Sequence, residues 1–415
     1  MSGASQQRPA RECDRALTQL PNPTGNNRCW VAAALMSMAL CSPIADKISE
    51  VASKLKALPP CDEGWGEVYN VVLLLHRFIG CVGDVETPSR RQSVADRHSA
   101  VEAAYGSLLT SLPGAICAVD GGESCGVAAM QPLALAILQK QPECARMMTC
   151  WLLKIVRTSS VAIEAALGRD APPHWPPGLG EVQTRSCARC SVIRTQVCEG
   201  DTCNVTISID SDTTVLAALQ RRAAKERQES DELPHPCGAC GHQAFDKTTS
   251  LKVGDTPPVI VIIEFQRTQD GIVHYTKQRH INHKVNVDKE LLLSQLDPCL
   301  PPANDRKLYL QSATVHANGA THYKTHAYRG CPSTGGRGWD TYDDSRPSAG
   351  MSPDPKEVVF LVYATGSHAS TPWPGAAGAG VCASTATATC AAGGAGGGAG
   401  GVGGGGVGVG VGVGV

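Results

Sequence analysis

Two short cysteine motifs constrain the fold of this chain more than any other feature. They are Cys187-Ala-Arg-Cys190 and Cys237-Gly-Ala-Cys240. Each motif places two sulfurs on one tight knuckle, and two knuckles complete a tetrahedral site of four thiolates. Because four thiolates leave no open position for water, a bound Zn²⁺ would be structural. The sequence therefore predicts a zinc-tied extension, with two unrelated redox pairs or a fortuitous spacing as the alternatives.

A single cysteine, Cys29, stands where a polar loop (22–28) meets an apolar segment with a helical pattern (31–41). Backbone N–H groups and the helix dipole favour an anion at such a point, so the site favours a thiolate, which is the nucleophilic form. Arg28 adds a neighbouring positive charge. By itself this pattern also fits a buried thiol on a core helix. A catalytic role needs a base elsewhere in the chain.

Composition excludes several classes of protein. The formal net charge is −1 and the pI is about 6.8, so no global field attracts nucleic acid or an anionic membrane. No run reaches the ~18 uninterrupted apolar residues that suggest a membrane span. The 19 cysteines are odd in number, several lie in apolar runs, and the N-terminal residues lack an apolar signal core. We expect a reducing compartment, cytoplasmic or nuclear, and not secretion.

The pattern of apolar residues changes along the chain. The first third is predicted to be helical, over about 29–58, 67–78, 101–111 and 130–158, with a polar loop over 83–100. After a Pro/Gly cluster at 168–180, β-branched runs follow at 205–210, 259–265, 307–315 and 358–363, with one helix at 215–228. Residues 1–19 are expected to be a disordered lead-in. Residues 367–415, rich in Gly, Ala and Val, are expected to be a disordered tail.

The order of motifs resembles that of the ubiquitin-specific protease family of cysteine deubiquitinases, over about residues 18–365. The family opens with a box of the form Asn-x-Gly-Asn-Thr-Cys-Tyr, and later carries a Gln-x-Asp-Ala helix, paired C-x-x-C motifs, a Pro-Pro-Val strand, a Gly-His-Tyr box and an acidic box. The matching segments here are 25–30, 141–148, 187–240, 257–267, 309–323 and 339–345. The second of these is a weak match, mainly at Gln141 and Ala145.

This resemblance implies a papain-like α/β cysteine protease fold. One catalytic domain would span 20–366, with a helical thumb at about 20–166, zinc-ribbon fingers at about 181–256 and a β-rich palm at about 257–366. Cys29 would be the nucleophile, His322 the general base and Asp343 the group that orients the imidazole, with Asp344 as an assistant. His316 and His326 flank His322 and are its competitors for the base role.

The loop before Cys29 departs from the family pattern. The family has an oxyanion-donating Asn five residues before the nucleophile, and this chain has Thr24 there. The nearby amides Asn22, Asn26 and Asn27 are the candidate replacements. Losing one oxyanion donor typically costs ~10²–10³ in rate. Arg28 and Thr321 also replace small residues beside Cys29 and His322.

The function that the resemblance implies is hydrolysis of the bond after the C-terminal glycine of ubiquitin or a ubiquitin-like protein. The partners would be that protein and its conjugates, the cofactor structural Zn²⁺, and the chain itself a monomer that binds neither nucleic acid nor membrane. Two alternatives remain: an inactive ubiquitin-binding scaffold of the same fold, and a protease of that fold that acts on another polypeptide.

Overall fold

The computed structural model describes most of the chain between residues 17 and 367. The described residues are 17–20, 27–58, 63–86, 93–119, 132–141, 143–170, 175–176, 178–198, 203–222, 226–228, 237–242, 245–267, 281–317, 322–330, 338–344 and 346–367. Residues 1–16 of the predicted lead-in and residues 368–415 of the predicted tail lie outside them, as do Asn22 and Asn26. Residues 17–19 of the lead-in are described, and Thr18 among them is buried.

Helices fill the first part of the fold, as the sequence predicted. They are α1 (Cys29–Ala39), α2 (Ser42–Ala57), α3 (Glu63–Glu86), α4 (Val94–Val119), α5 (Pro132–Gln139) and α6 (Ala145–Ala166), and two shorter helices follow later, α7 (Val215–Arg222) and α8 (Leu293–Leu296). The loop expected over 83–100 is much shorter, because α3 runs to Glu86 and α4 begins at Val94. The single helix expected over 130–158 is two helices, α5 and α6.

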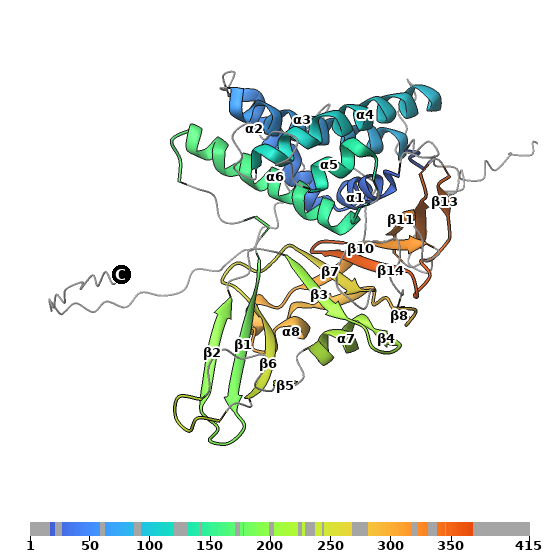
Figure 1. The fold of residues 1–415 in the computed structure, drawn as a ribbon. Coiled ribbons are helices and arrows are strands. Elements are labelled where there is room, and N and C mark those ends of the chain that lie inside the picture. The colour runs from blue at the N-terminus through green and yellow to red at the C-terminus, as the bar shows by residue number, and fades with distance from the viewer. Residues whose placement is uncertain are drawn as a thin grey trace, which may run out of the picture. The chain divides into compact units, whose positions relative to one another are not determined.

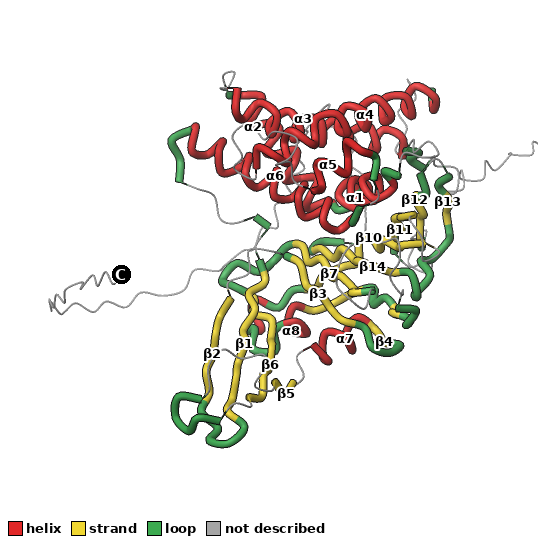
Figure 2. The backbone as a smooth tube through the Cα atoms, in the orientation of Figure 1, coloured by secondary structure: helices red, strands yellow, loops and turns green. Residues whose placement is uncertain are grey.

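Strands fill the second part. They are β1 (Leu179–Cys187), β2 (Ile193–Cys198), β3 (Asn204–Ser208), β4 (Thr213–Thr214), β5 (Glu226–Gln228), β6 (Phe245–Val253), β7 (Ile260–Gln266), β8 (Val285–Asn286), β9 (Glu290–Leu292), β10 (Lys307–Ala317), β11 (His322–Tyr328), β12 (Trp339–Tyr342), β13 (Ser348–Ala349) and β14 (Val358–Ala364). The larger sheet has the order β13-β12-β11-β10-β14-β7-β3, with β9 beside β10, and a smaller sheet has the order β2-β1-β6-β5. Figures 1 and 2 show both sheets.

The two faces of the larger sheet pack against different helices. On one face, Ile260, Ile262 and Phe360 join the core of helices α1 to α6. On the other face, Val261 and Ile263 join a second core with residues of α7 and α8. Because successive strand residues point to opposite faces, the continuous apolar run of β7 serves both cores. Figure 1 shows α1 to α6 gathered on one side of this sheet.

The range predicted for the fingers, 181–256, does not form one separate unit. Strand β3 lies inside that range but pairs in parallel with β7 of the larger sheet. Helix α7 lies inside it too and packs in the second core. Strands β1, β2, β5 and β6 alone make the smaller sheet. The extension therefore consists of two segments on either side of a stretch that belongs to the larger sheet.

Helix α1 is buried on every side. All eleven of its residues are buried, and a helix that is apolar all round is a core helix. Two hydrogen bonds fix it to the larger sheet: Thr325 Oγ1 donates to the Ala33 carbonyl at 3.1 Å, and Ser37 Oγ lies 3.1 Å from Thr314 Oγ1. The residue that begins this helix, Cys29, is thereby held beside strand β11.

Helix α3 contains a 20-residue stretch, Gly66–Val85, that is long and apolar enough to cross a membrane. It is not an uninterrupted apolar run, because polar residues such as Glu67 and Asn70 lie within it. Half of the stretch is buried inside the fold. A core helix of a folded domain has these same properties.

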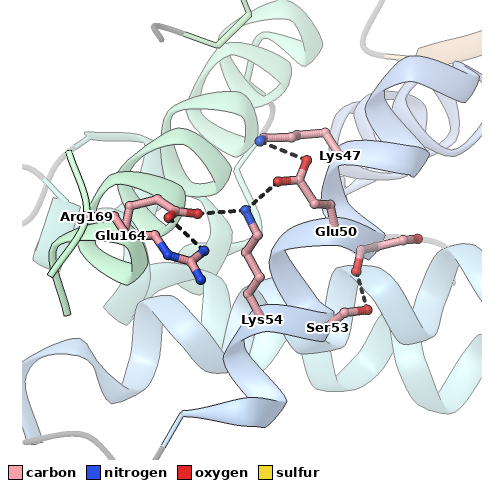
Figure 3. A network of polar contacts seen from close by, with 7 residues as sticks. Lys47, Glu50, Ser53, Lys54, Glu164 and Arg169 are labelled. Carbon is pink, nitrogen blue, oxygen red and sulfur yellow. Dashed lines mark hydrogen bonds and ion pairs between the residues drawn. The ribbon is translucent and has the colours of Figure 1, made fainter. Parts of the chain in front are cut away.

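A polar network joins α2 to the end of α6 at the surface (Figure 3). Lys54 Nζ lies 2.7 Å from Glu50 Oε1 and 2.6 Å from Glu164 Oε1. Lys47 also contacts Glu50, at 3.0 Å, and Arg169 contacts Glu164, at 3.5 Å. Exposed single pairs contribute little, but a network with one shared cation fixes the packing of two helices more strongly.

A buried arginine ties the end of β7 to two neighbouring segments. Arg267 is 4% exposed. Its Nε donates to the Val358 carbonyl at 2.9 Å, its Nη2 to Pro355 at 2.9 Å, and its Nη1 to the carbonyls of Ile281 and His283. Burial lowers the pKa of Arg267 to about 10, so the side chain stays charged at neutral pH.

Replacing Arg267 by Met should lower the free energy of unfolding by about 3 kcal/mol or more, because it leaves the carbonyl of the buried Val358 and three partly buried carbonyls without this donor. Urea unfolding followed by circular dichroism measures this. Arg221→Met is the matched control, since this guanidinium is 42% exposed and should change stability by at most ~0.5 kcal/mol. Equal stability of the two variants would contradict the role of Arg267.

Candidate active site and metal centre

The structure brings together Cys29, His322 and Asp343, three residues that are far apart in the sequence. His322 begins β11, Cys29 begins α1, and Asp343 directly follows β12. His322 Nε2 lies 2.6 Å from Asp343 Oδ1. A hydrogen bond with Cys29 is the main cause that raises the pKa of His322 to about 9. With Nε2 engaged by Asp343, Nδ1 is the ring nitrogen left for the thiol.

The carboxyl group of Asp343 is held in its charged form. Partial burial alone would raise its pKa, but hydrogen bonds from Lys324 and then His322 outweigh burial and lower the pKa below its usual range. An ionised Asp343 accepts from Nε2–H and so fixes the tautomer and orientation of the ring. The imidazole therefore lies between a thiol and an orienting carboxylate and contacts both.

Asp344 is a second carboxylate at the same imidazole. Its Oδ2 lies 3.8 Å from His322 Nδ1. Its φ of 47° is a left-handed backbone conformation, and its carbonyl accepts the Leu20 N–H at 3.0 Å. The chain thus turns sharply after Asp343, and two adjacent carboxylates face one ring from different directions.

The start of α1 is tied to α5 and to the residues that follow it. Trp30 Nε1 donates to the Gln141 carbonyl at 3.1 Å, and Arg28 Nη2 donates to the Ile137 carbonyl at 3.1 Å. Arg28, which departs from the family pattern, therefore fixes the chain directly before Cys29. Cys29 itself is 2% exposed. The cavity beside it measures about 10 Å³ and is lined by residues that include Leu20, Met36 and Tyr323.

The candidate oxyanion donors are only partly described. Asn27 is exposed and has a left-handed φ of 44°, while Asn22 and Asn26 lie outside the described residues. The Cys29 N–H belongs to the first turn of α1, where N–H groups point toward the N-terminal end of the helix. That N–H is a further donor candidate, in addition to the three amides.

The competing histidines lie in other environments. His326 is buried, and burial lowers its pKa to about 4. Its Nδ1 lies 3.1 Å from the Met351 carbonyl and 3.0 Å from Thr341 Oγ1. His316 is buried against the ring of Tyr323, at 4.7 Å between centroids. Neither makes the contacts with Cys29 and Asp343 that His322 makes.

The four cysteines of the two C-x-x-C motifs form one cluster. Their sulfurs lie within 4.8 Å of one another, and two pairs, Cys187 with Cys240 and Cys190 with Cys237, are 3.6 Å apart. A tetrahedron with Zn–S bonds of about 2.3 Å has edges of about 3.8 Å. The four thiols therefore fit a metal ion of this kind.

Both knuckles have the same backbone geometry. The residue four positions after each first cysteine has a left-handed φ, 56° at Ser191 and 69° at Gly241. The Ser191 and Gly241 N–H groups donate to the Cys187 and Cys237 carbonyls. N–H groups of Cys190 and Arg189 lower the pKa of Cys187 to about 6. Such N–H groups aimed at sulfur favour the thiolate, the form that binds metal.

One residue at the candidate active site escaped the sequence analysis. Lys324 Nζ lies 2.7 Å from Asp343 Oδ2. Residues 322 and 324 point to the same face of a strand because side chains alternate. This alternation indicates from the sequence that Lys324 lies on the same face as His322. The partner could not be predicted, because it depends on the register between β11 and β12.

No family model matches the chain, and no curated protein matches it. Solved structures do. A chain of the SAGA DUB module Ubp8/Sgf11/Sus1/Sgf73 bound to monoubiquitin matches with a TM-score of 0.59 at 14% identity, covering 88% of this chain and 72% of that chain. The module bound to ubiquitin aldehyde matches with a TM-score of 0.57 at 14% identity, covering 87% of this chain and 72% of that chain. The yeast module with an Sgf73 mutant matches with a TM-score of 0.56 at 14% identity, covering 87% of this chain and 71% of that chain. The likeness shows a shared fold.

Proposed function

We propose that this chain is a cysteine-type deubiquitinase with a papain-like fold. The observation that carries the proposal is the contact of His322 with both Cys29 and Asp343. The likeness in fold to a module bound to ubiquitin supports it, as does the order of motifs that resembles the ubiquitin-specific proteases. The substrate would be the isopeptide or peptide bond after the C-terminal glycine of ubiquitin or a ubiquitin-like protein.

The reaction begins at the thiol. His322 Nδ1 takes the proton of Cys29, and the thiolate sulfur attacks the glycine carbonyl carbon. The carbonyl oxygen becomes an oxyanion, which accepts hydrogen bonds from the Cys29 N–H and from an amide of the preceding loop. The imidazolium returns its proton to the leaving amine nitrogen as the carbon–nitrogen bond breaks, and a thioester remains.

Water completes the cycle. His322 takes a proton from a water molecule, whose oxygen attacks the thioester carbon, and the carbon–sulfur bond breaks. The products are a ubiquitin with a free C-terminal carboxylate and a regenerated Cys29. Throughout, Asp343 holds the ring by Nε2 and stabilises the imidazolium. Asp344 lies close enough to add to that stabilisation.

Substrate entry requires a local opening. Cys29 is 2% exposed and the cavity beside it is about 10 Å³, about the room that one water molecule needs. The segment with Thr18 and Leu20 lines this cavity together with Tyr323. We propose that this segment shifts when the C-terminus of the substrate enters.

The cysteine cluster would hold structural Zn²⁺ and thereby order a zinc ribbon at the end of the smaller sheet. When bound, the ion supplies cross-linking of the two knuckles and no chemistry at Cys29. Free thiols and metal-binding thiolates both suit a reducing compartment, so we propose a cytoplasmic or nuclear location. We further propose that the chain acts as a monomer on ubiquitin conjugates.

The test is incubation of the whole chain with ubiquitin that carries a C-terminal fluorogenic amide. We expect release of the fluorophore by the wild type and none above background with Cys29→Ala. Cys299→Ala is the matched control, because this cysteine is exposed and belongs to neither cluster. Absence of Cys29-dependent cleavage of ubiquitin and of ubiquitin-like proteins would overturn the proposal.

The second candidate is an inactive ubiquitin-binding scaffold. The burial of Cys29 to 2% exposure favours it, since a closed site cannot react. An activity-based ubiquitin probe separates the two functions, because it bonds to Cys29 only in an assembled and accessible site. Binding of ubiquitin without labelling by the probe would identify the scaffold.

A further inference from the structure

We propose that Lys324 is a positioning residue of the candidate triad, one that holds Asp343 and limits the negative charge around His322. This inference rests on the proposed function. It starts from one carboxylate with a partner on each oxygen: His322 Nε2 is 2.6 Å from Oδ1, and Lys324 Nζ is 2.7 Å from Oδ2.

The fold explains why both partners reach one carboxylate. His322 and Lys324 are two residues apart on β11 and so point to the same face. Strand β12 pairs with β11 and ends at Tyr342, directly before Asp343. The carboxylate thus emerges beside the face that carries the imidazole and the ammonium.

Asp343 needs such an anchor because the sheet does not hold it. Strand β12 stops one residue earlier, and the backbone turns at Asp344 with a φ of 47°. A carboxylate with a single hydrogen bond can rotate about its side-chain torsions. A second contact, at the other oxygen, fixes the plane of the carboxylate and hence the direction in which it accepts from Nε2–H.

Charge gives Lys324 a second role. Two carboxylates, Asp343 and Asp344, face one imidazole. If neither were offset, they would favour the imidazolium so strongly that it became a weak proton donor to the leaving group. The ammonium of Lys324 neutralises one of the two, and its hydrogen bond contributes to the lowered pKa of Asp343.

The other groups around the ring do not replace this charge. On α1 the ring faces Cys29, and Arg28 beside it donates to the Ile137 carbonyl. On α4, Tyr105 is buried, and burial raises its pKa well above the ordinary range, so it stays neutral. On β11, His326 is held neutral by burial. Within the described residues, Lys324 is the cation in contact with Asp343 other than His322 itself.

The test compares Lys324→Met, which removes the charge, with Lys324→Arg, which keeps it. The first readout is the titration of His322 by NMR with labelled histidine, assigned by loss of one of 12 histidine signals in His322→Gln. We expect the Met variant to titrate about one pH unit higher than the wild type. The Arg variant should return to within ~0.3 unit of it.

The second readout is the pH profile of kcat/KM on fluorogenic ubiquitin. In Lys324→Met the basic limb should move up with the His322 titration, and kcat should fall about 3- to 10-fold while KM stays the same. Lys252→Met is the matched control, an exposed lysine on β6. Thermal unfolding of each variant shows whether the variant is still folded. If Lys324→Met is unfolded, Lys324→Gln is used in its place.

The outcomes separate this inference from the proposed function. If wild-type protein cleaves no ubiquitin but Lys324→Met shifts the His322 titration and Arg restores it, the positioning role stands and the proposed function falls. If the wild type cleaves ubiquitin and the titration is the same in all variants, the positioning role is wrong and the proposed function stands.

Discussion

Replacing His322 by alanine should lower kcat/KM on fluorogenic ubiquitin by about 10⁴ or more, and adding Cys29→Ala should cost nothing further. The reason is that thiol and imidazole act as a unit: without the base the thiol is not deprotonated in position, and without the thiol the base has no task. Asp343→Asn should lower kcat/KM somewhat less, because the imidazole of His322 remains but is held in the wrong tautomer.

Steady-state rates of the two single variants and the double variant measure this coupling. His283→Ala is the control, since His283 is 44% exposed and pairs with Asp212 at the surface, 3.8 Å away. If His322→Ala keeps a tenth of the wild-type rate, or if the double variant is far slower than either single one, then these residues do not act as one unit.

The pH dependence of the same reaction has a definite direction. The pKa of His322 is raised from 6.5 to about 9, first of all by its hydrogen bond with Cys29. Activity that needs the imidazolium should therefore fall as pH rises through about 9. Since the folded pKa lies above the unfolded one, the contribution of His322 to stability is complete below pH 6.5 and is lost as pH rises through about 9.

Removal of metal should unfold the smaller sheet while the rest of the fold persists. Strand β1 is buried only at its two ends, Leu179 and Cys187. At the far end the buried cluster is made of Cys187 and Cys237, with Cys240 packed on it. With so few apolar contacts, the sheet would depend on the binding free energy of a zinc ion, which is about 10–16 kcal/mol for zinc-finger peptides.

Hydrogen exchange with and without a strong chelator measures this effect. We expect the amides of β1, β2 and β6 to lose protection, those of α1 and β10 to keep it, and metal analysis to give about one zinc per chain. Cys237→Ser should mimic the chelator, whereas Cys299→Ser, at an exposed thiol, should not. Purified protein without zinc, or unchanged protection in Cys237→Ser, would contradict the structural role of the cluster.

Local signals in the sequence sufficed for some elements. The helix at Cys29 and the strands β7, β10 and β14 were predicted because their apolar residues run continuously or alternate along the segment. The start of α4 was missed although its signal is present: Ser93 Oγ accepts the Asp96 N–H at 3.1 Å, a helix cap of the Ser-x-x-Asp type. The cap was overlooked because residues 83–100 were predicted to be a polar loop.

The strands of the smaller sheet could not be predicted. The segment 181–187 has no apolar face, because the sheet buries little, so the alternation that reveals a strand is missing. At the candidate active site, the sequence pointed to Cys29, His322 and Asp343 by resemblance, and the structure brings them into contact. Lys324 was missed because its role depends on strand register, which is a property of the folded sheet.

The strand order also has a consequence for synthesis of the chain on the ribosome. Strand β14, which ends at Ala364, lies between β10 and β7 in the larger sheet. The sheet that supports His322 therefore cannot close until nearly all of the described fold has been made. At ~5–20 residues per second, Cys29 emerges roughly 20–70 s before its partners are in place. During that interval the nascent chain carries the Cys29 thiol without the imidazole and carboxylate that the folded sheet brings beside it.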